Sequence, residues 1–495
     1  MKPKFSIITK SGRGNCPVTF GEHNAVLDLS GIDDRLFDIE IVFETRILGF
    51  RNHDYTWVKP DKARIANIFS PKAIRLENGY FIQPDQNIGI WEVLPDNQTR
   101  LLWRFNPEDS SPLTIYSGVK NEKLTTNADN PAPRTVTLLF SKHNAIEFSR
   151  SKIPFSAIAC FTDHCDFDTA ENLKRQRELF HSCGIKTTKG FFLNHYSKRA
   201  ANASFENDSD ELKKWQADGH ELAYHSLSQS IKSDAESFAD FRNFNPPFDS
   251  PTWIDHGYQP YNLSLYRNNN ISDSDFADTM QSKNVKTFWN YIDSGTATEN
   301  IINQLNADDF TLARFRKGIS GLGLRQKMSL LVKNILFHYY ADEKIIGQYK
   351  SAAGEVKNVI YKRNFAKLLP MLRNVFKLAL PLFRVLLFWN SHKNMPYRFA
   401  KYTPLLFRHR ISGREFTIFQ TVEMIDFKKA LRPENMQKLI GESGVFIAHT
   451  YFSAPMPYHT GRMFSTPPCY VRVVLTGRFL SINLISKVVS TSSRC

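Results

Sequence analysis

The sequence of 495 residues predicts an α/β protein with an antiparallel β domain in front and a basic helical insertion within it. Three observations lead to this fold class. Apolar and polar residues alternate in short runs at the start, strand and helix patterns alternate from residue 150, and a basic, helix-prone segment interrupts them. The length suits about two or three domains, each able to bury its own core.

Residues 1–145 form the first predicted domain, which we expect to be rich in β-structure. The runs IEIVFETRIL and NIGIWEVL alternate with a period of two, and breaks such as PDQN and NPEDSSP separate runs of this kind. Alternation with turn-rich breaks is typical of antiparallel strands. The sequence therefore predicts a β-sandwich or a small barrel for this domain.

Residues 150–300 begin the α/β part. PFSAIACFT is a predicted buried strand, and TAENLKRQRELFHSC a helix with Thr169 as its N-cap and Gly184 at its end. DELKKWQADG is a second predicted helix, with Ser209 as its cap, and further strands are IKTTKGFFL, HELAYHS, PTWIDHG and VKTFWNYID. Residues 412–495 add EFTIFQTVE, VFIAHTY and a C-terminal tail. This alternation predicts a mainly parallel sheet, open or closed into a barrel.

Residues 301–411 are the predicted helical insertion. Within 311–410 there are 20 Lys and Arg against three acidic residues, so this part carries more than the whole net charge of +15. Two interpretations remain open: an insertion packed on the barrel, or a basic amphipathic surface that lies on an anionic membrane. No nucleic-acid-binding module is recognisable around it, so no nucleic-acid partner is expected.

Cysteine usage and the N-terminus bear on location. The six cysteines are scattered without a CxxC pair, which argues against a disulfide scaffold or a structural zinc module. The first residues, MKPKFSIITKSGRGNCPVTF, lack the apolar run of a secretory signal peptide. We therefore expect a cytoplasmic protein, which the basic segment would place on the inner face of the membrane if it binds lipid.

The densest group of chemically capable side chains follows the strand PFSAIACFT. The stretch FTDHCDFDT holds Asp163, His164, Asp166 and Asp168, and a later strand, ELAY, leads directly into His225. The carboxyl ends of parallel strands meet at one edge of a sheet, where active sites are built. Histidine with carboxylate is the ligand set of a catalytic zinc or related site. The alternative is a polar turn in which Asp168 merely caps the helix.

Further candidates lie after the next strands. His256 is a candidate metal ligand or substrate contact, and Asp255, Trp253 and Tyr258 beside it are candidate substrate-binding residues, as is Trp289 in VKTFWNYID. Aromatic faces suit stacking against sugar rings. Core packing is the competing interpretation for each aromatic residue, and a structural histidine for His256.

These motifs together resemble the polysaccharide deacetylases of the NodB-homology type. FTDH occupies the place of that family's paired acids, GHE at 219–221 and the turn that begins at His225 match its second motif, and the order of the later strands agrees. The resemblance implies a distorted (β/α) barrel. It makes Asp163 the general base, while His164 stands where the family has its second acid and Gln229 where it has a ligand histidine.

The resemblance also supplies a general acid and a cofactor. FIAHTYFSAP is similar to the family's last motif, which makes His449 the acid that protonates the leaving amine, with Glu423 a weaker candidate for orienting it. The implied cofactor is a divalent metal, with zinc expected. Since one family ligand is replaced, the expected metal ligands are His164, Asp166, His225 and His256.

The function that follows is a metal-dependent hydrolase that removes an acyl group, in the first place N-acetyl, from a sugar. The carbohydrate would belong to a surface polysaccharide or its precursor. Two alternatives remain: a degenerate deacetylase-like protein that binds glycan without turnover, and a metal-dependent hydrolase of another bond, such as a phosphoester. Aspartate and histidine sites serve both kinds of hydrolysis.

Overall fold

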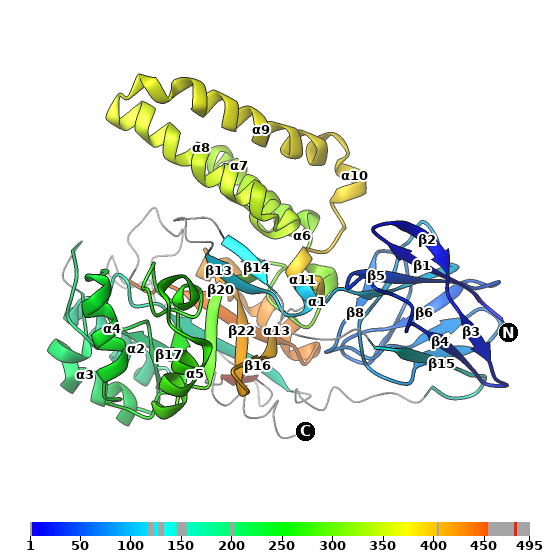
Figure 1. Ribbon diagram of the computed structural model, residues 1–495, viewed down its shortest axis with the longest axis horizontal. Helices are drawn as coiled ribbons and strands as arrows, with labels where there is room; N and C mark the ends of the chain where they lie inside the picture. The colour runs from blue at the N-terminus through cyan, green and yellow to red at the C-terminus, as the bar shows by residue number, and fades with distance from the viewer. Residues whose placement is uncertain are drawn as a thin grey trace.

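The computed structural model places a β-rich unit and an α/β unit side by side, with a pair of long helices projecting from the α/β unit (Figure 1). The six-stranded sheet of the β-rich unit is wholly antiparallel. Its order is β2 (Gly12–Asn15), β1 (Lys4–Thr9), β5 (Phe37–Val42), β12 (Arg100–Phe105), β11 (Ile90–Val93) and β8 (Arg64–Ala66). The structure describes residues 2–116, 123–126, 133–145, 156–198, 202–402, 405–453 and 480–482.

A seven-stranded antiparallel sheet completes the β-rich unit. Its order is β3 (Val18–Phe20), β4 (Asn24–Asp28), β15 (Thr135–Ser141), β10 (Phe81–Pro84), β9 (Ile74–Leu76), β6 (Ile47–Arg51) and β7 (Trp57–Val58). Alternate residues of both sheets, among them Leu27, Ile39, Ile82 and Trp103, are fully buried in one shared core. The period of two in the sequence therefore corresponds to an inner and an outer face.

Seven parallel strands form the α/β sheet, and their pairings run in a circuit. The order is β16 (Ala157–Asp163), β17 (Thr188–Phe191), β18 (Glu221–Tyr224), β19 (Thr252–Ile254), β20 (Thr287–Ala297), β22 (Arg414–Met424) and β23 (Val445–Thr450). β23 pairs with β16, which also pairs with β17 through Thr162↔Thr188 and Asp163↔Lys189. β21 (Leu406–Ile411) adds an antiparallel strand on β22, and β24 (Leu480–Ile482) pairs with β16.

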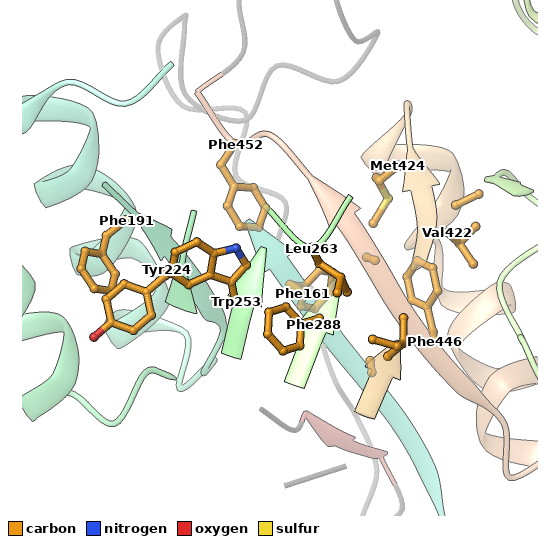
Figure 2. Packing of buried hydrophobic residues seen from close by; sticks show 14 of the residues in the cluster. Phe161, Phe191, Tyr224, Trp253, Leu263, Phe288, Val422, Met424, Phe446 and Phe452 are labelled. Carbon is orange, nitrogen blue, oxygen red and sulfur yellow. The ribbon is translucent and has the colours of Figure 1, made fainter. Parts of the chain in front are cut away.

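The outer faces of these strands pack against helices through a large aromatic core. Figure 2 shows Phe191, Tyr224 and Trp253 from three neighbouring strands in one layer, all of them buried. The helices are α2 (Ala170–Ser182), α3 (Phe205–Ala217), α4 (Asp234–Asn243), α5 (Asp273–Ser282), α12 (Phe427–Ala430) and α13 (Pro433–Gly441). Side chains that point the other way, among them Ile158, Ala223 and Phe419, form a second buried cluster, which leaves the ends of the strands to build a site.

Local helix signals explain where two of these helices begin. Thr169 caps α2, as predicted, by accepting a hydrogen bond from the backbone N–H of Asn172. The cap predicted at Ser209 is wrong, because α3 begins at Phe205 and Ser204 caps it through the N–H of Asn207. Asp208, the residue before Ser209, has a non-helical conformation inside α3. The predicted helix start after Ser209 therefore coincides with a kink in α3 and not with its beginning.

The insertion is helical throughout most of its length. It contains α6 (Leu312–Gly318), α7 (Leu324–Asn334), the π-helical turn η3 (Ile335–Tyr340), α8 (Glu343–Lys362), α9 (Leu368–Leu387), α10 (Trp389–His392) and α11 (Arg398–Tyr402). α8 and α9 pack against each other through Ala352, Leu378 and Leu382 and stand out from the α/β unit (Figure 1). No helix in the described part of the chain has both the length and the apolar character needed to cross a membrane.

Candidate metal centre

Three strands of the circuit, β16, β18 and β19, deliver the candidate ligands to one edge. His164 follows the last residue of β16, His225 follows β18, and His256 lies two residues beyond β19. Because all these strands are parallel, their carboxyl ends lie together, and the loops that leave them share one opening. The structure thus brings residues that are 92 positions apart in the sequence into one cluster.

His164, Asp166 and His225 form the central group. One ligand atom from each lies within 4.8 Å of the other two, which is close enough for all three to hold one ion. Both histidines are almost fully buried, and the Asp166 side chain is 16% exposed. The Nε2 atom of His164 is buried without a hydrogen-bond partner in the described chain. A buried donor or acceptor left open in this way is the kind of atom that a metal ion would satisfy.

Backbone carbonyls fix the orientation of two imidazole rings in this group. His225 donates from Nδ1 to the carbonyl of Ile254 (3.3 Å), and His256 donates from Nε2 to that of Gln229 (2.9 Å). In a neutral ring the other nitrogen then carries a lone pair. Those two nitrogens each lie 3.0 Å from a carboxylate oxygen of Asp166.

Each of these lone pairs would be repelled by the negative oxygen that it faces unless a positive charge lies between them. Protons or a metal ion can fill that role, and a ring whose far nitrogen is held by a carbonyl is the usual arrangement of a histidine ligand. The donor set therefore fits a divalent metal. Its mixture of imidazole nitrogen and carboxylate oxygen suits zinc.

Electrostatics prepare the same residues for an ion. Burial would raise the pKa of Asp166, but His256 and His225 outweigh it and hold that pKa well below its usual range. Burial, helped by the neighbouring His449, lowers the pKa of His164 well below its ordinary value, and burial also lowers the pKa of His225. At neutral pH the carboxylate is charged and these imidazoles are neutral, which is the state that binds metal.

His449 lies against this group and is held by a carboxylate. Its ring stacks on that of His164 at 4.1 Å, and its Nδ1 lies 3.2 Å from Oδ1 of Asp293. Burial would lower the pKa of His449, but the charge and hydrogen bond of Asp293 raise it above its ordinary value. Thr421 in turn donates to Asp293 (2.5 Å) and accepts from the indole of Trp289 (2.9 Å). The Nε2 atom of His449 is left without a protein partner among the described residues.

Two residues at this edge adopt backbone conformations that L-residues rarely take. Ser226, next to His225, has a φ of 53°, and Tyr291 has a φ of 58° where β20 bulges against β22. Such conformations cost of order 1–3 kcal/mol each and persist where the surrounding structure holds them. The bulge turns Trp289, Tyr291 and Asp293 toward the same space.

The group opens into a cavity of about 400 Å³. Asp166, His225, His256 and His449 lie on its wall with the aromatic faces of Trp289, Tyr291 and Tyr451. The insertion supplies another part of the wall, through Lys333, Phe337, His338, Ala341 and Ile346, and Thr114 of β13 (Leu113–Tyr116) adds one more residue. The cavity is therefore shared by segments that are far apart in the sequence.

Asp163, the predicted general base, is not part of the cavity wall. It is fully buried on the other face of β16, where it accepts hydrogen bonds from Lys189 Nζ (2.5 Å) and the Phe452 backbone (2.8 Å). Burial raises its pKa to about 7 despite the nearby Lys189. Lys189 also pairs with Asp168, so both acids belong to an internal ion-pair network. The predicted role of Asp163 is corrected on this ground, because successive strand residues point to opposite faces.

Two of the predicted substrate contacts lie elsewhere as well. Trp253 is fully buried in the aromatic core of Figure 2, and Tyr258 packs on Tyr116 at 5.0 Å outside the cavity wall. Asp255 borders the cavity, but its carboxylate is buried and accepts from the Trp253 indole and the backbone N–H groups of Leu263 and Ser264. Trp289 is the predicted contact whose ring lies in the cavity, 4.7 Å from that of His164 and 4.8 Å from that of His449.

Two further expectations are modified by the geometry. His256 lies against Asp166 but outside the group of three atoms that share the 4.8 Å limit, so it supports Asp166 at the edge of the site. Glu423 does not orient His449. It pairs with Lys333 of the insertion, with both oxygens within 2.8 Å of Nζ. The residue that orients His449 is Asp293.

Asp293 was missed in the sequence, although a signal was present. It stands two and four positions after Tyr291 and Trp289, and alternate residues of a strand share a face. Lys333, Phe337 and His338 were missed for another reason. They lie in a helical segment, and nothing in its composition indicates that it would contact strand ends that are distant in the sequence.

Comparisons with known proteins add little to this site. No family model and no curated protein matches the chain. Among solved structures the chain is similar to a xylosidase from Aspergillus niger, with 12% identity and a TM-score of 0.21. The alignment covers 59% of this chain and 41% of that enzyme, so the chain spans less than half of its length. A TM-score this low carries no argument about fold or activity.

Proposed function

We propose that the protein is a metal-dependent hydrolase that removes an acyl group, in the first place N-acetyl, from a sugar. The observation that carries the proposal is the group of His164, Asp166 and His225, whose ligand atoms lie within 4.8 Å of one another beside an acid–base pair. The proposal includes the view that the circuit of parallel strands is the distorted barrel expected from the deacetylase resemblance.

His164, Asp166 and His225 would hold the ion, and His256 would steady Asp166. When bound, a divalent metal supplies a Lewis acid and a water of lowered pKa, both of which suit attack on an amide carbonyl. The carbonyl of Ile254 orients the ring of the ligand His225, and the carbonyl of Gln229 orients His256 toward Asp166. The protein's own contribution would be to gather three donor atoms and to hold the orientation of the His225 ring.

His449 is the group that can move a proton. Its Nε2 lies in the cavity wall without a partner in the described chain, and Asp293 stabilises its protonated form. Amide cleavage needs an acid for the departing nitrogen, and a raised pKa favours the protonated form of His449 that could serve as this acid. Asp293 and Thr421 hold the ring in place, so they act as positioning residues.

The cavity wall would also bind the sugar. Trp289, Tyr291 and Tyr451 present aromatic surface next to the ligand group, and polar side chains are interspersed among them. Aromatic faces with a few placed polar groups are typical of small-ligand sites. This arrangement suits a carbohydrate better than an extended, highly charged polymer.

The test is metal analysis of the purified protein, followed by hydrolysis assays. We expect a stoichiometric divalent metal, release of acetate from N-acetylated sugars, loss of activity with a chelator, and recovery with Zn²⁺. His225→Ala should remove both metal and activity, whereas the matched change His181→Ala, on the exposed end of α2, should remove neither. Phosphate release in place of acetate would instead identify a phosphoesterase, and a metal-free protein that Zn²⁺ does not activate would refute the proposal.

A further inference from the structure

The outer face of α9 is a continuous stripe of large apolar side chains. Its members are Leu369, Leu372, Phe376, Leu380, Phe383 and Leu387, which are between 52% and 79% exposed. Their spacing of three or four residues places them on one face of the helix, over a length of about 30 Å. The opposite face is occupied, because Leu378 and Val385 are buried in the packing that joins α9 to the rest of the protein. We call these six residues the α9 stripe.

Cations border the α9 stripe along one side. Arg373, Lys377 and Arg384 each directly follow a stripe residue, so each lies about 100° further round the helix than its neighbour. No Asp or Glu occurs between Glu355 and Glu415. A long apolar face with purely cationic flanks complements a bilayer surface, which offers acyl chains beneath a layer of negative headgroups. A protein partner would need to match both features over the whole length of α9.

A groove beside the α9 stripe fits the same ligand. It has a volume of about 580 Å³ and lies between α9 and the segment formed by η3 and α8, and three stripe residues, Leu380, Phe383 and Leu387, also line it. Tyr340, Ile345 and Pro381 line its apolar part, and Lys377 and Arg384 lie among its lining residues. Apolar walls next to two cations are suited to a lipid chain with a phosphate headgroup.

We propose that the α8–α9 hairpin lays the α9 stripe into an anionic lipid leaflet, and that the hydrolase acts on a sugar carried by a lipid in that leaflet. The second half of this statement rests on the proposed function. It follows from the path of the chain, because Phe337 and His338 line the catalytic cavity while Tyr340 and Ile345, a few residues later, line the groove. A lipid held in the groove lies next to the segment that forms the cavity wall.

The first experiment measures sedimentation of the full chain with phosphatidylcholine vesicles, with and without phosphatidylglycerol. We expect binding to the anionic vesicles that weakens with salt. The double variant Phe376→Asp/Leu380→Asp should bind at least about 10-fold more weakly, because each of these side chains would lose the burial of a large apolar group. The matched control is Leu324→Asp, an apolar residue of α7 that is 77% exposed, like the stripe residues, but lies outside the stripe.

Three results would overturn the docking surface. The first is wild-type protein that does not bind anionic vesicles at low salt. The second is a double variant that binds the vesicles as well as the wild type does. The third is a wild-type dimer in solution that the double substitution dissociates and that anionic vesicles leave intact. Far-ultraviolet circular dichroism and metal content establish that the variant is folded. If the double variant lacks native helicity, Leu369→Ser, at a site 78% exposed, provides the same comparison with a milder change.

The second experiment compares an N-acetylated sugar on a lipid in the vesicles with the same sugar free in water. We expect the wild type to prefer the lipid-linked sugar, and the double variant to lose that preference while it keeps its rate on the free sugar. Equal loss on both sugars would refute the membrane-borne substrate. Vesicle binding without hydrolysis of either sugar would refute the proposed function and leave the docking surface standing.

Discussion

Two clusters of ionisable side chains lie back to back at the end of β16, and they differ in how their polar atoms are satisfied. On one face, the Nζ of Lys189 donates to Asp163, Asp168 and Gln176, and these acceptors are bonded further to their neighbours. On the other face, Nε2 of His225 and Nδ1 of His256 each lie 3.0 Å from an oxygen of Asp166, and the second nitrogen of each ring donates to a backbone carbonyl. The first cluster is a closed ion-pair network and the second is an open donor set.

The comparison shows what separates a structural cluster from a candidate metal site. Both are buried, and both contain acidic residues from the same short stretch of sequence. Charges that neutralise each other in place stabilise the fold and leave no room for a ligand. A carboxylate that faces imidazole nitrogens can be matched by protons on those nitrogens or by a metal ion, so this cluster can accept a ligand.

The largest expected effect is on the open donor set. Asp166→Ala removes the carboxylate on which both imidazoles converge, so metal affinity should fall by more than about 100-fold and hydrolysis with it. Elemental analysis and a competition titration with a chelating dye measure this. Asp168→Asn, in the closed network, is the matched control and should keep its metal. Equal metal loss in both variants would mean that the two clusters are not separate.

The next effect concerns His449, which contacts the donor set without belonging to it. His449→Asn should lower kcat by about 100- to 10,000-fold while metal content is unchanged, since a proton-transfer group contributes about that much. Asp293→Asn should lower kcat less, because the imidazole remains and loses only its partner. Steady-state kinetics on metal-loaded variants decide the matter. Activity close to that of the wild type in His449→Asn would remove it from the mechanism.

The closed network should respond through stability. Lys189→Met leaves Asp163 and Asp168 buried without their cation, which should cost about 3–5 kcal/mol in the free energy of unfolding. Lys186→Met, three positions earlier and partly exposed, should cost far less. Asp163→Asn should leave kcat within a few-fold of the wild type. A loss of kcat at full metal content would restore Asp163 as the general base. Urea unfolding and kinetics provide both readouts.

A buried lysine in the β-rich unit extends the comparison to a group without an ionic partner among the described residues. Its expected effect, on the pH dependence of stability, is the smallest per pH unit. Lys72 is 3% exposed and hydrogen-bonded to Asn67 and Asn87, and burial lowers its pKa from 10.5 to about 7. Between these pH values the unfolded chain binds one more proton, so Lys72 makes stability rise with pH, by at most about 1.4 kcal/mol per unit. Lys72→Met should lack this rise in urea unfolding at several pH values. Parallel pH profiles for the two proteins would contradict the assignment.

Much of the site's framework could be predicted from the sequence. Short buried strands that lead directly into His164 and His225, and one that carries His449 as its last residue but one, appear where they were expected, and the Thr169 cap is confirmed. These features depend on local patterns, namely apolar runs and capping side chains. Local patterns also suffice to place strand ends on one edge when the strands are parallel.

The rest depended on contacts that a sequence does not display. Asp163 and His164 are adjacent, and a single step along β16 decides which of them faces the cavity. Lys189, which donates a hydrogen bond to Asp163, lies 26 positions later on another strand. The alternation of Trp289, Tyr291 and Asp293 placed Asp293 on a shared face, but the left-handed conformation of Tyr291 at a bulge of β20 was not visible in the sequence.

The cavity has a floor and a wall that belong to separate stretches of chain. The ligands come from 164–256, whereas Lys333, Phe337 and Ile346 of the wall come from the insertion, which is tied to β22 through the ion pair of Lys333 with Glu423. If the protein is a hydrolase as proposed, residues of the insertion would contact the substrate without holding the ion. Exchanging them would then alter substrate choice while metal binding is kept, so this segment would be the place to redesign specificity.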